Sequence, residues 1–227
     1  MRIAVLGTGV VGRTLAAKLA SLGHETRLGT RDVQASLAST QATRDGTGTL
    51  ADWRDANPSI PIETFAGAAD GAEVVFNATA GQGSLDALRA AGDLSGVVVV
   101  DVSNPLDFSR GMPPRLSVCN DDSLAEQLQR ELPDAKVVKA LNTVTAAVMV
   151  DPASVAGGDH TMFMAGDDDG AKSVVRGILE DGFGWRHMID LGGIPAARGM
   201  EMYLPLWVAM MGAQGSAMFN VRVVPTA

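Results

Sequence analysis

Three glycines near the start of the chain have the spacing of a phosphate-binding turn. Gly7, Gly9 and Gly12 form G-x-G-x-x-G, directly after the apolar run Ile3 to Leu6 and directly before a helical stripe of apolar residues. In such a turn the first glycine permits a tight bend, the second lets the backbone approach a diphosphate, and the third lets helix and strand pack closely. The helix that follows offers unpaired N–H groups and a partial positive charge to the phosphates. The motif predicts a dinucleotide site, and a purely structural glycine turn is the alternative.

The next predicted strand carries residues that could select the nucleotide. It covers positions 24–28 and is followed by Gly29, Thr30 and Arg31. At this place a carboxylate would accept hydrogen bonds from the ribose of NADH, whereas a hydroxyl and a guanidinium suit the 2′-phosphate of NADPH. The sequence therefore favours NADPH. Asp32 is evidence against this reading, because a shift of one residue would bring an acid near the ribose. A surface turn without a ligand also stays open.

Short polar segments follow three later apolar runs, and they supply the remaining candidate binding residues. They are NATAG at 77–81, SNP at 103–105 and LNTV at 141–144, with Asn77, Ala78, Thr79, Ser103, Asn104, Pro105, Leu141 and Asn142 as the candidates. Doubly wound folds bind their ligands at the carboxyl ends of the strands, so these segments fit a rim around a nicotinamide ring. For each segment taken alone, an ordinary turn is an equally good interpretation.

Conventional catalytic groups are scarce in this sequence. The three histidines are isolated at predicted strand ends, and no cysteine or histidine spacing is typical of a metal site. The lone Cys119 is expected to be a buried or inert thiol. The sequence predicts no metal site and no paired catalytic acid and base, so Ser103, Asn104 and Asn142 would act by positioning.

Apolar runs alternate with helical stripes along most of the chain. Strands are predicted at 3–6, 24–28, 60–65, 73–78, 97–102, 136–141, 160–165 and 187–191. Helices are predicted from 11 to 22 and at 84–91, 122–132 and 170–181, and a short one at 50–56 in a long connection between 42 and 61. The run at 97–102 is apolar on both faces, as in a strand that helices cover on each side. This alternation predicts an α/β, doubly wound Rossmann-type fold with a mainly parallel sheet.

The character of the sequence changes after residue 194. Met200, Tyr203, Leu204 and Trp207 fall at helical spacing, and Pro205 either kinks this helix or begins a new one. We therefore divide the chain into an NADP-binding domain, 1–194, and a C-terminal helical segment, 195–227. The segment is too short to form a substrate domain. It would complete the acceptor site or a dimer interface, which predicts a homodimer.

Composition limits the classes of partner and compartment. The net charge of −8 argues against nucleic acid, whose phosphates require clustered basic residues. One cysteine excludes a disulfide within the chain. The apolar runs are too short for a signal peptide or a membrane span. The sequence predicts a cytoplasmic protein with no membrane partner.

Taken in order, the motifs resemble the F420-dependent NADP oxidoreductases. The matching segments are Gly7-Thr8-Gly9-x-x-Gly12, Gly29-Thr30-Arg31, Ser103-Asn104-Pro105, Lys139-Ala140-Leu141-Asn142-Thr143 and Phe219-Asn220. The resemblance covers essentially the whole chain. It implies hydride exchange between NADP(H) and coenzyme F420, an 8-hydroxy-5-deazaflavin that would be the small-molecule redox acceptor. Such a reaction requires mainly positioning and exclusion of water, in keeping with the missing acid–base pair.

The resemblance also implies roles for particular residues. Thr8, Val10, Thr30 and Arg31 would hold the NADP phosphates. Ser103, Asn104 and Pro105, with Leu141 and Asn142, would lie by the deazaflavin or the nicotinamide. The remaining predicted cofactor-binding residues are Gly7, Gly9, Val11, Gly12, Asn77, Ala78 and Thr79. Two other functions stay open: an NADPH-dependent reductase of a flavin, imine or carbonyl compound, and a non-catalytic NADPH-sensing module.

Overall fold

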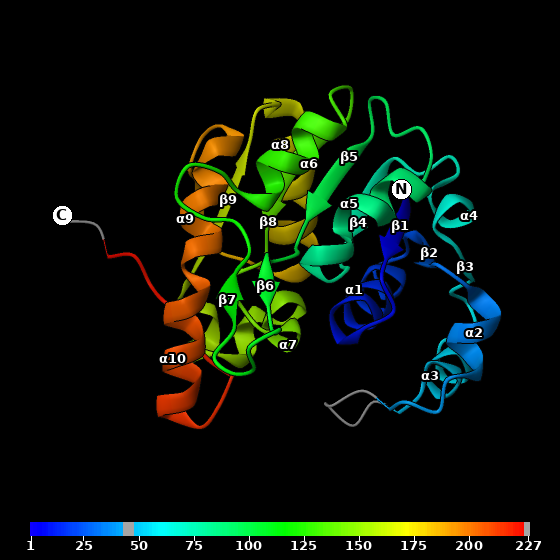
Figure 1. Ribbon diagram of the computed structural model, residues 1–227, viewed down its shortest axis with the longest axis horizontal. Helices are drawn as coiled ribbons and strands as arrows, with labels where there is room; N and C mark the ends of the chain where they lie inside the picture. The colour runs from blue at the N-terminus through cyan, green and yellow to red at the C-terminus, as the bar shows by residue number, and fades with distance from the viewer. Residues whose placement is uncertain (43–47, 225–227) are drawn as a thin grey trace.

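An eight-stranded sheet forms the middle layer of the protein in the computed structural model (Figure 1). Residues 1–42 and 48–224 are described, so part of the predicted 42–61 connection and the last residues of the tail lie outside the described residues. The strands are β1 (Arg2–Leu6), β2 (Glu25–Thr30), β3 (Ile62–Thr64), β4 (Val74–Asn77), β5 (Val98–Asp101), β8 (Lys136–Ala140), β9 (Thr161–Gly166) and β10 (His187–Asp190). Their order is β10-β9-β8-β5-β4-β1-β2-β3, and β8 and β9 form the antiparallel pair. The predicted Rossmann-type fold is confirmed.

Helices cover both faces of this sheet. Those of the first half are α1 (Val10–Ser21), α2 (Val33–Ala38), α3 (Leu50–Ala56), α4 (Phe65–Ala69) and α5 (Gly81–Ala90). Those of the second half are α6 (Leu124–Glu131), α7 (Ala146–Val150), α8 (Asp169–Gly177), α9 (Ala197–Met202) and α10 (Leu204–Gln214), and a π-helical turn, Ile178–Phe183, extends α8. A small hairpin of β6 (Leu106–Asp107) and β7 (Arg115–Leu116) stands apart from the main sheet.

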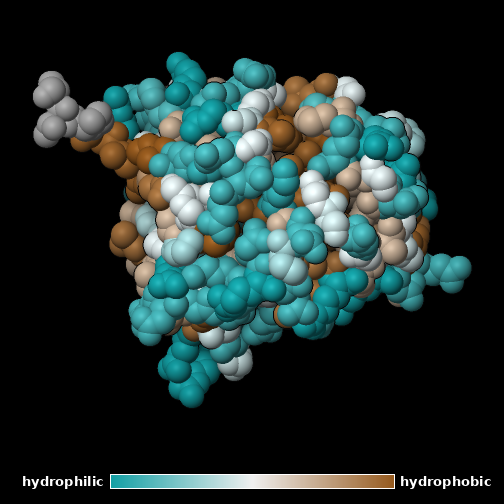
Figure 2. Space-filling view, turned by 90° about the horizontal axis from the view of Figure 1, so that it is seen from above, coloured by the Kyte–Doolittle hydropathy of each residue, from teal (hydrophilic) through white to brown (hydrophobic). Residues whose placement is uncertain are grey.

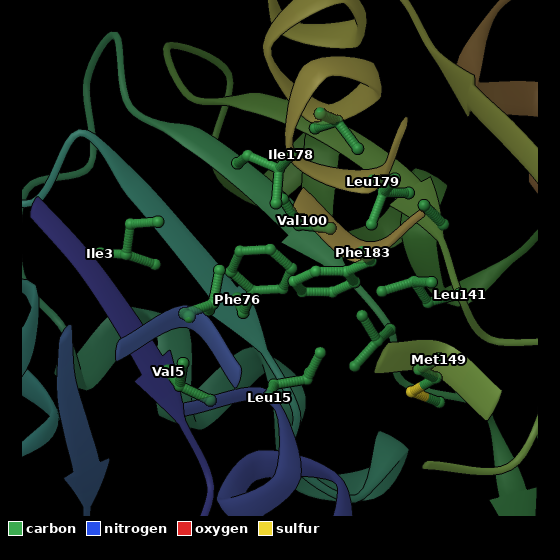
Figure 3. Close-up of a cluster of buried hydrophobic side chains, with 14 of the residues drawn as sticks. Ile3, Val5, Leu15, Phe76, Val100, Leu141, Met149, Ile178, Leu179 and Phe183 are labelled. Carbon is green, nitrogen blue, oxygen red and sulfur yellow. The ribbon is translucent and has the colours of Figure 1, made fainter. Parts of the chain in front are cut away.

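Alternating strand residues divide the hydrophobic core into two clusters, one on each face. In β1, Ile3 and Val5 belong to the cluster that includes Leu15 of α1, where Phe76 and Phe183 lie close together (Figure 3). Ala4 and Leu6 of the same strand belong to the other cluster, with residues of α4, α5 and α6. Successive side chains of a strand point to opposite faces, so a strand that is apolar throughout is buried on both.

The order of the strands creates a crevice between β1 and β4. From β1 the chain proceeds outward through β2 and β3, and it then returns to place β4, β5 and β8 on the other side of β1. The two loops that leave β1 and β4 therefore diverge, which is where doubly wound folds bind ligands. Backbone hydrogen bonds fix both loops at their base: Gly7 N donates to Gly29 O, and Ala78 N donates to Leu6 O, each at 2.9 Å.

Several boundaries differ from the predicted ones. The predicted strand 60–65 is too long, because the Thr64 side chain accepts a hydrogen bond from Gly67 N and so begins α4 at Phe65. The short helices α2, α4 and α7 were not predicted from periodicity, which needs more than two turns to show. Pro205 lies in the first turn of α10, so it begins a helix rather than kinking one.

The C-terminal helices lie at the opposite end of the molecule from α2 and α3 (Figure 1). Ala197, Met200 and Glu201 of α9 are buried, whereas Leu204 is the buried residue of α10. The sequence of α10, LPLWVAMMGAQ, carries no charge. Since Leu204 is its buried residue, the other apolar side chains of this helix are partly or largely exposed. Brown atoms gather next to the end of the chain in Figure 2. No helix of the described part is both long and apolar enough to cross a membrane.

Candidate active site

Two adjoining hollows lie at the carboxyl ends of the central strands. The larger, which we call the glycine-loop cleft, has a volume of about 1450 Å³. Its walls include Gly7, Thr8, Gly9, Thr30, Arg31, Asp32, residues of α2 and residues of α5. The smaller, which we call the β5 hollow, has a volume of about 410 Å³ and is lined by Val11, Val102, Ser103, Asn104 and part of the β6–β7 hairpin. Ala78, Thr79, Ala80 and Gln82 line both hollows, so one ligand could extend from the first into the second.

The glycine loop is shaped by three different steric requirements. Gly7 has a φ of +114°, and a Cβ there would lie 2.6 Å from Ala78 O. A Cβ on Gly12 would collide with the carbonyl group of Gly7, whereas a Cβ on Gly9 would meet nothing within 4 Å. The first and third glycines therefore permit close packing within the protein, and the second opens onto the cleft.

The N-terminus of α1 supplies the donors that an anion requires. Its N-cap is Gly9, which has no side chain to accept from the first-turn amides, and that turn, all of it described, contains no acidic residue. Backbone N–H groups at a helix start that lack an intrahelical partner bind phosphate well. The loop therefore fits a diphosphate.

Two charged residues, Arg31 and Asp32, follow the end of β2 and have different roles. The Asp32 side chain caps α2 by accepting from Ala35 N at 2.9 Å. Arg31 is exposed and lines the cleft, and it forms no ion pair with any residue that the structure describes. Thr30 shares a hydrogen bond of 2.7 Å with the hydroxyl group of Ser36. Because Asp32 is engaged as a cap, the objection that it raised to a 2′-phosphate site is weakened.

The polar segments after β4, β5 and β8 come together, but their residues lie at different depths. Ala78, Thr79, Ser103 and Asn104 line the β5 hollow. Asn77 is buried beneath them, and its Oδ1 accepts from the Thr79 hydroxyl at 2.7 Å.

The resemblance implies that Leu141, Asn142 and Pro105 lie by the cofactor rings, and the structure places all three outside the lining of the two hollows. Leu141 is fully buried in the hydrophobic core, and neither Asn142 nor Pro105 lines the two hollows. Asn142 acts from below: its Nδ2 donates to Asn104 Oδ1 at 2.9 Å and to Met200 O at 3.0 Å, and Asn104 Nδ2 donates to Asn142 O at 2.9 Å. Strand-end residues alternate between the surface and the core, and periodicity alone does not show which of them point inward.

A buried ionic cluster beneath the β5 hollow escaped the sequence analysis. Lys139 Nζ contacts Asp101 Oδ2 and Glu201 Oε1, each at 2.8 Å, and donates to Ser103 O at 2.6 Å. All three charged side chains are at most 1% exposed. Burial acts to lower the pKa of Lys139, but the charges of Asp101 and Glu201 outweigh it and raise the pKa, so this side chain is a cation. The signal in the sequence was Asp101 at the end of the apolar run VVVVD and Lys139 near the end of KVVKA, the run that begins at Lys136.

Comparison with known proteins agrees with this geometry. A sequence profile of the family described as NADP oxidoreductase coenzyme F420-dependent matches residues 2–105. The F420-dependent NADP reductase of Methanothermobacter marburgensis is 30% identical over 213 residues, covering 92% of this chain and 91% of that protein. The chain belongs to the F420-dependent NADP oxidoreductase family. The predicted family is confirmed, and the protein is an NADP-dependent oxidoreductase of a family that uses NADP(H) and F420.

Solved structures extend the likeness of this oxidoreductase to its three-dimensional fold. A protein of Arthrobacter sp. FB24, assigned as an F420-dependent NADP-reductase, is 50% identical; the match covers 99% of this chain and all of that one, with a TM-score of 0.94. A reductive aminase of Aspergillus terreus in complex with NADPH is 14% identical, with 94% of this chain and 62% of that chain covered and a TM-score of 0.60. The second likeness shows the fold alone.

Proposed function

We propose that this oxidoreductase transfers a hydride between NADPH and coenzyme F420, with the nucleotide in the glycine-loop cleft and the deazaflavin ring in the β5 hollow. The observation that carries the proposal is the wall that the two hollows share, Ala78 to Ala80 with Gln82. A nicotinamide ring lying along this wall could reach the β5 hollow while its diphosphate stays at the start of α1. When bound, NADPH supplies a hydride and the deazaflavin accepts it together with one proton.

The glycine loop would hold the diphosphate. Its residues are Gly7, Thr8, Gly9, Val10, Val11 and Gly12, and their contribution is mainly backbone N–H groups at the start of α1. Thr30 and Arg31 would bind the 2′-phosphate, because a guanidinium forms charge-assisted hydrogen bonds that NADH cannot use. Asp32, held as the cap of α2, would stay out of this contact.

The polar residues around the β5 hollow would position the rings rather than exchange protons. Thr79, Ser103 and Asn104 line it, and Asn77 and Asn142 hold them from below through the hydrogen bonds described above. Two carbons that exchange a hydride need alignment and a dry contact, and neither needs a strong acid from the protein. Solvent would supply the proton.

The C-terminal segment, residues 195–227, would complete the acceptor site or a homodimer interface. An apolar helix exposed along most of its length favours association, since monomers seldom expose contiguous apolar surface. Leu206 on α10 is 57% exposed, and Met202 just before it is 37% exposed. We also propose a cytoplasmic location, which suits the exposed free thiol of Cys119.

Stopped-flow mixing of the purified protein with NADPH and F420 tests the reaction. We expect the absorbance of the oxidised deazaflavin to bleach in the first turnover, with NADPH much more effective than NADH. FMN and a cyclic imine serve as alternative acceptors under the same conditions. Reduction of one of these without bleaching of F420 would favour a reductase of another small molecule. NADPH binding with no acceptor reduced would favour the sensing module.

A further inference from the structure

The side chain of Lys139 joins the end of β5 to α9 through three separate contacts. An ammonium group has three donors, and here they meet the Asp101 carboxylate, the Ser103 carbonyl and the Glu201 carboxylate. Because each acceptor belongs to a different residue, the position of Nζ fixes those three residues relative to one another.

Ser103, a wall residue of the β5 hollow, is held at every polar atom by this cluster. Its carbonyl oxygen accepts from Lys139 Nζ, while its N and Oγ donate to Asp101 Oδ1 at 3.2 and 2.6 Å. Asp101 Oδ1 also accepts from Asn77 Nδ2 at 2.9 Å. The cluster therefore constrains the residues that leave both β4 and β5.

Glu201 extends the same constraint to the C-terminal helices. Its two carboxylate oxygens accept from Leu124 N at 2.8 Å and Ala125 N at 3.1 Å, at the start of α6. The preceding residue of α9, Met200, accepts through its carbonyl oxygen from Asn142. One end of the cluster thus lies under the hollow and the other end anchors α9.

Stability alone is a weak explanation for this cluster. Burying charges is expensive, and apolar residues of similar volume in such places are often neutral or stabilising. Three fully buried charges with matched hydrogen-bond donors instead hold their side chains in one fixed arrangement, because any shift would leave a charge without a partner. A hydride transfer depends on such an arrangement, since a misplacement of about 1 Å can slow it about 100-fold.

We propose that Lys139 is a positioning residue for hydride transfer: with Asp101 and Glu201 it fixes the Ser103 wall of the β5 hollow relative to α9. This inference rests on the proposed function. Lys139 itself touches no hollow and transfers no proton.

The test replaces Lys139 with methionine and compares it with Lys172→Met. Lys172 is the control: it also contacts two carboxylates, Asp169 at 3.1 Å and Asp190 at 2.9 Å, but these partners are 96% and 34% exposed. Its partner Asp190 is the last residue of β10, and β10 is an edge strand of the sheet, separated from β8 by β9. Single-turnover hydride transfer, NADPH binding and amide hydrogen exchange are measured on both variants.

In Lys139→Met we expect hydride transfer to slow at least about tenfold, because the wall loses its fixed position. NADPH affinity should stay within about threefold of the parent, because the glycine loop is untouched. Exchange should quicken at the amides of 103, 104, 106, 124 and 125, and stay unchanged at 7–12. Lys172→Met should leave the hydride-transfer rate and these exchange rates unchanged.

A folded Lys139→Met that transfers hydride at the parental rate would overturn the proposal, and so would an equal loss in Lys172→Met. Should Lys139→Met fail to fold, Lys139→Met with Glu201→Gln restores the formal charge of the cluster to its parental value, and the same outcomes apply to this double variant.

Hydrogen exchange separates this proposal from the function on which it rests. If the parent never reduces F420, the proposed function fails, while unchanged exchange at 103, 104 and 106 would overturn the role of Lys139.

Discussion

The glycine-loop cleft and the β5 hollow adjoin, yet they are built from different parts of the chain. The contiguous β1–α1–β2 stretch supplies the glycine loop of the cleft, where we propose that backbone N–H groups hold a diphosphate. The wall of the β5 hollow is held by side chains from β4, β5, β8 and α9, which are far apart in the sequence.

This difference predicts which substitutions each hollow tolerates. A backbone site tolerates changes of side chain except where a Cβ would take space that a neighbour occupies. A site held by buried charges tolerates little, because removal of one partner leaves another charge unpaired in a medium of low polarity. Substitutions in the two regions should therefore differ in what they damage.

The largest expected effect is that of Gly12→Ala in the glycine loop. The new Cβ would collide with the Gly7 carbonyl, so we expect a loss of about 3 kcal/mol of stability and no measurable NADPH binding. Gly9→Ala is the matched control, because its Cβ meets nothing in the protein. The free energy of unfolding of Gly9→Ala should stay within about 0.5 kcal/mol of the parental value, while its NADPH binding should be weaker. Urea denaturation and fluorescence titration measure both quantities; full NADPH binding by Gly9→Ala would mean that this backbone does not face the diphosphate.

Arg31→Glu sharpens the comparison within the cleft, because it changes a side chain and leaves the backbone site intact. Loss of charge-assisted hydrogen bonds to a 2′-phosphate should weaken NADPH binding about 10- to 100-fold. NADH, which lacks that phosphate, should change by no more than about threefold. Arg176→Glu on α8 makes the same change of net charge elsewhere. Equal losses for the two nucleotides would show that Arg31 does not read the phosphate.

Leu206→Asp tests whether the C-terminal side of the molecule is completed by a second copy. This side chain is 57% exposed on α10, and burying a leucine contributes about 2 kcal/mol, so association should weaken more than tenfold. Val174→Asp, at a residue of α8 that is 37% exposed, controls for the loss of an exposed apolar group. Sedimentation velocity compares the three proteins. A parent that stays monomeric at micromolar concentration, or a Leu206→Asp variant that still dimerises, would contradict the proposed interface.

The smallest expected effect concerns acid stability on the α6 side. Hydrogen bonds from Arg130 lower the pKa of Asp122 to about 2. Because the folded pKa lies below the unfolded one, the stabilisation is present above about pH 4 and is lost as the pH falls toward 2. Arg130 is 60% exposed, so solvent screening limits the loss to about 1 kcal/mol. Urea denaturation from pH 6 to pH 2.5 should show a shallower decline for Asp122→Asn; parallel curves would contradict the assignment.

Local sequence rules determined the glycine-loop side of the proposed nucleotide site. The G-x-G-x-x-G motif, its place between a strand and a helix, and the Thr30-Arg31 pair after the second strand are all contiguous features. A tight turn and a helix start depend on residues next to one another, so the sequence was enough to predict the fold class and the place of the glycine loop between β1 and α1.

Only the tertiary structure decided which strand-end residues reach the ligand side and which charges meet. Leu141 and Asn142 follow a strand as Ser103 and Asn104 do, but Leu141 packs into the hydrophobic core and Asn142 donates to the Met200 carbonyl of α9. Lys139, Asp101 and Glu201 lie tens of residues apart, and no local pattern shows that they share one buried site. Burial of a charge depends on everything packed around it, and that is a property of the assembled layers rather than of any segment.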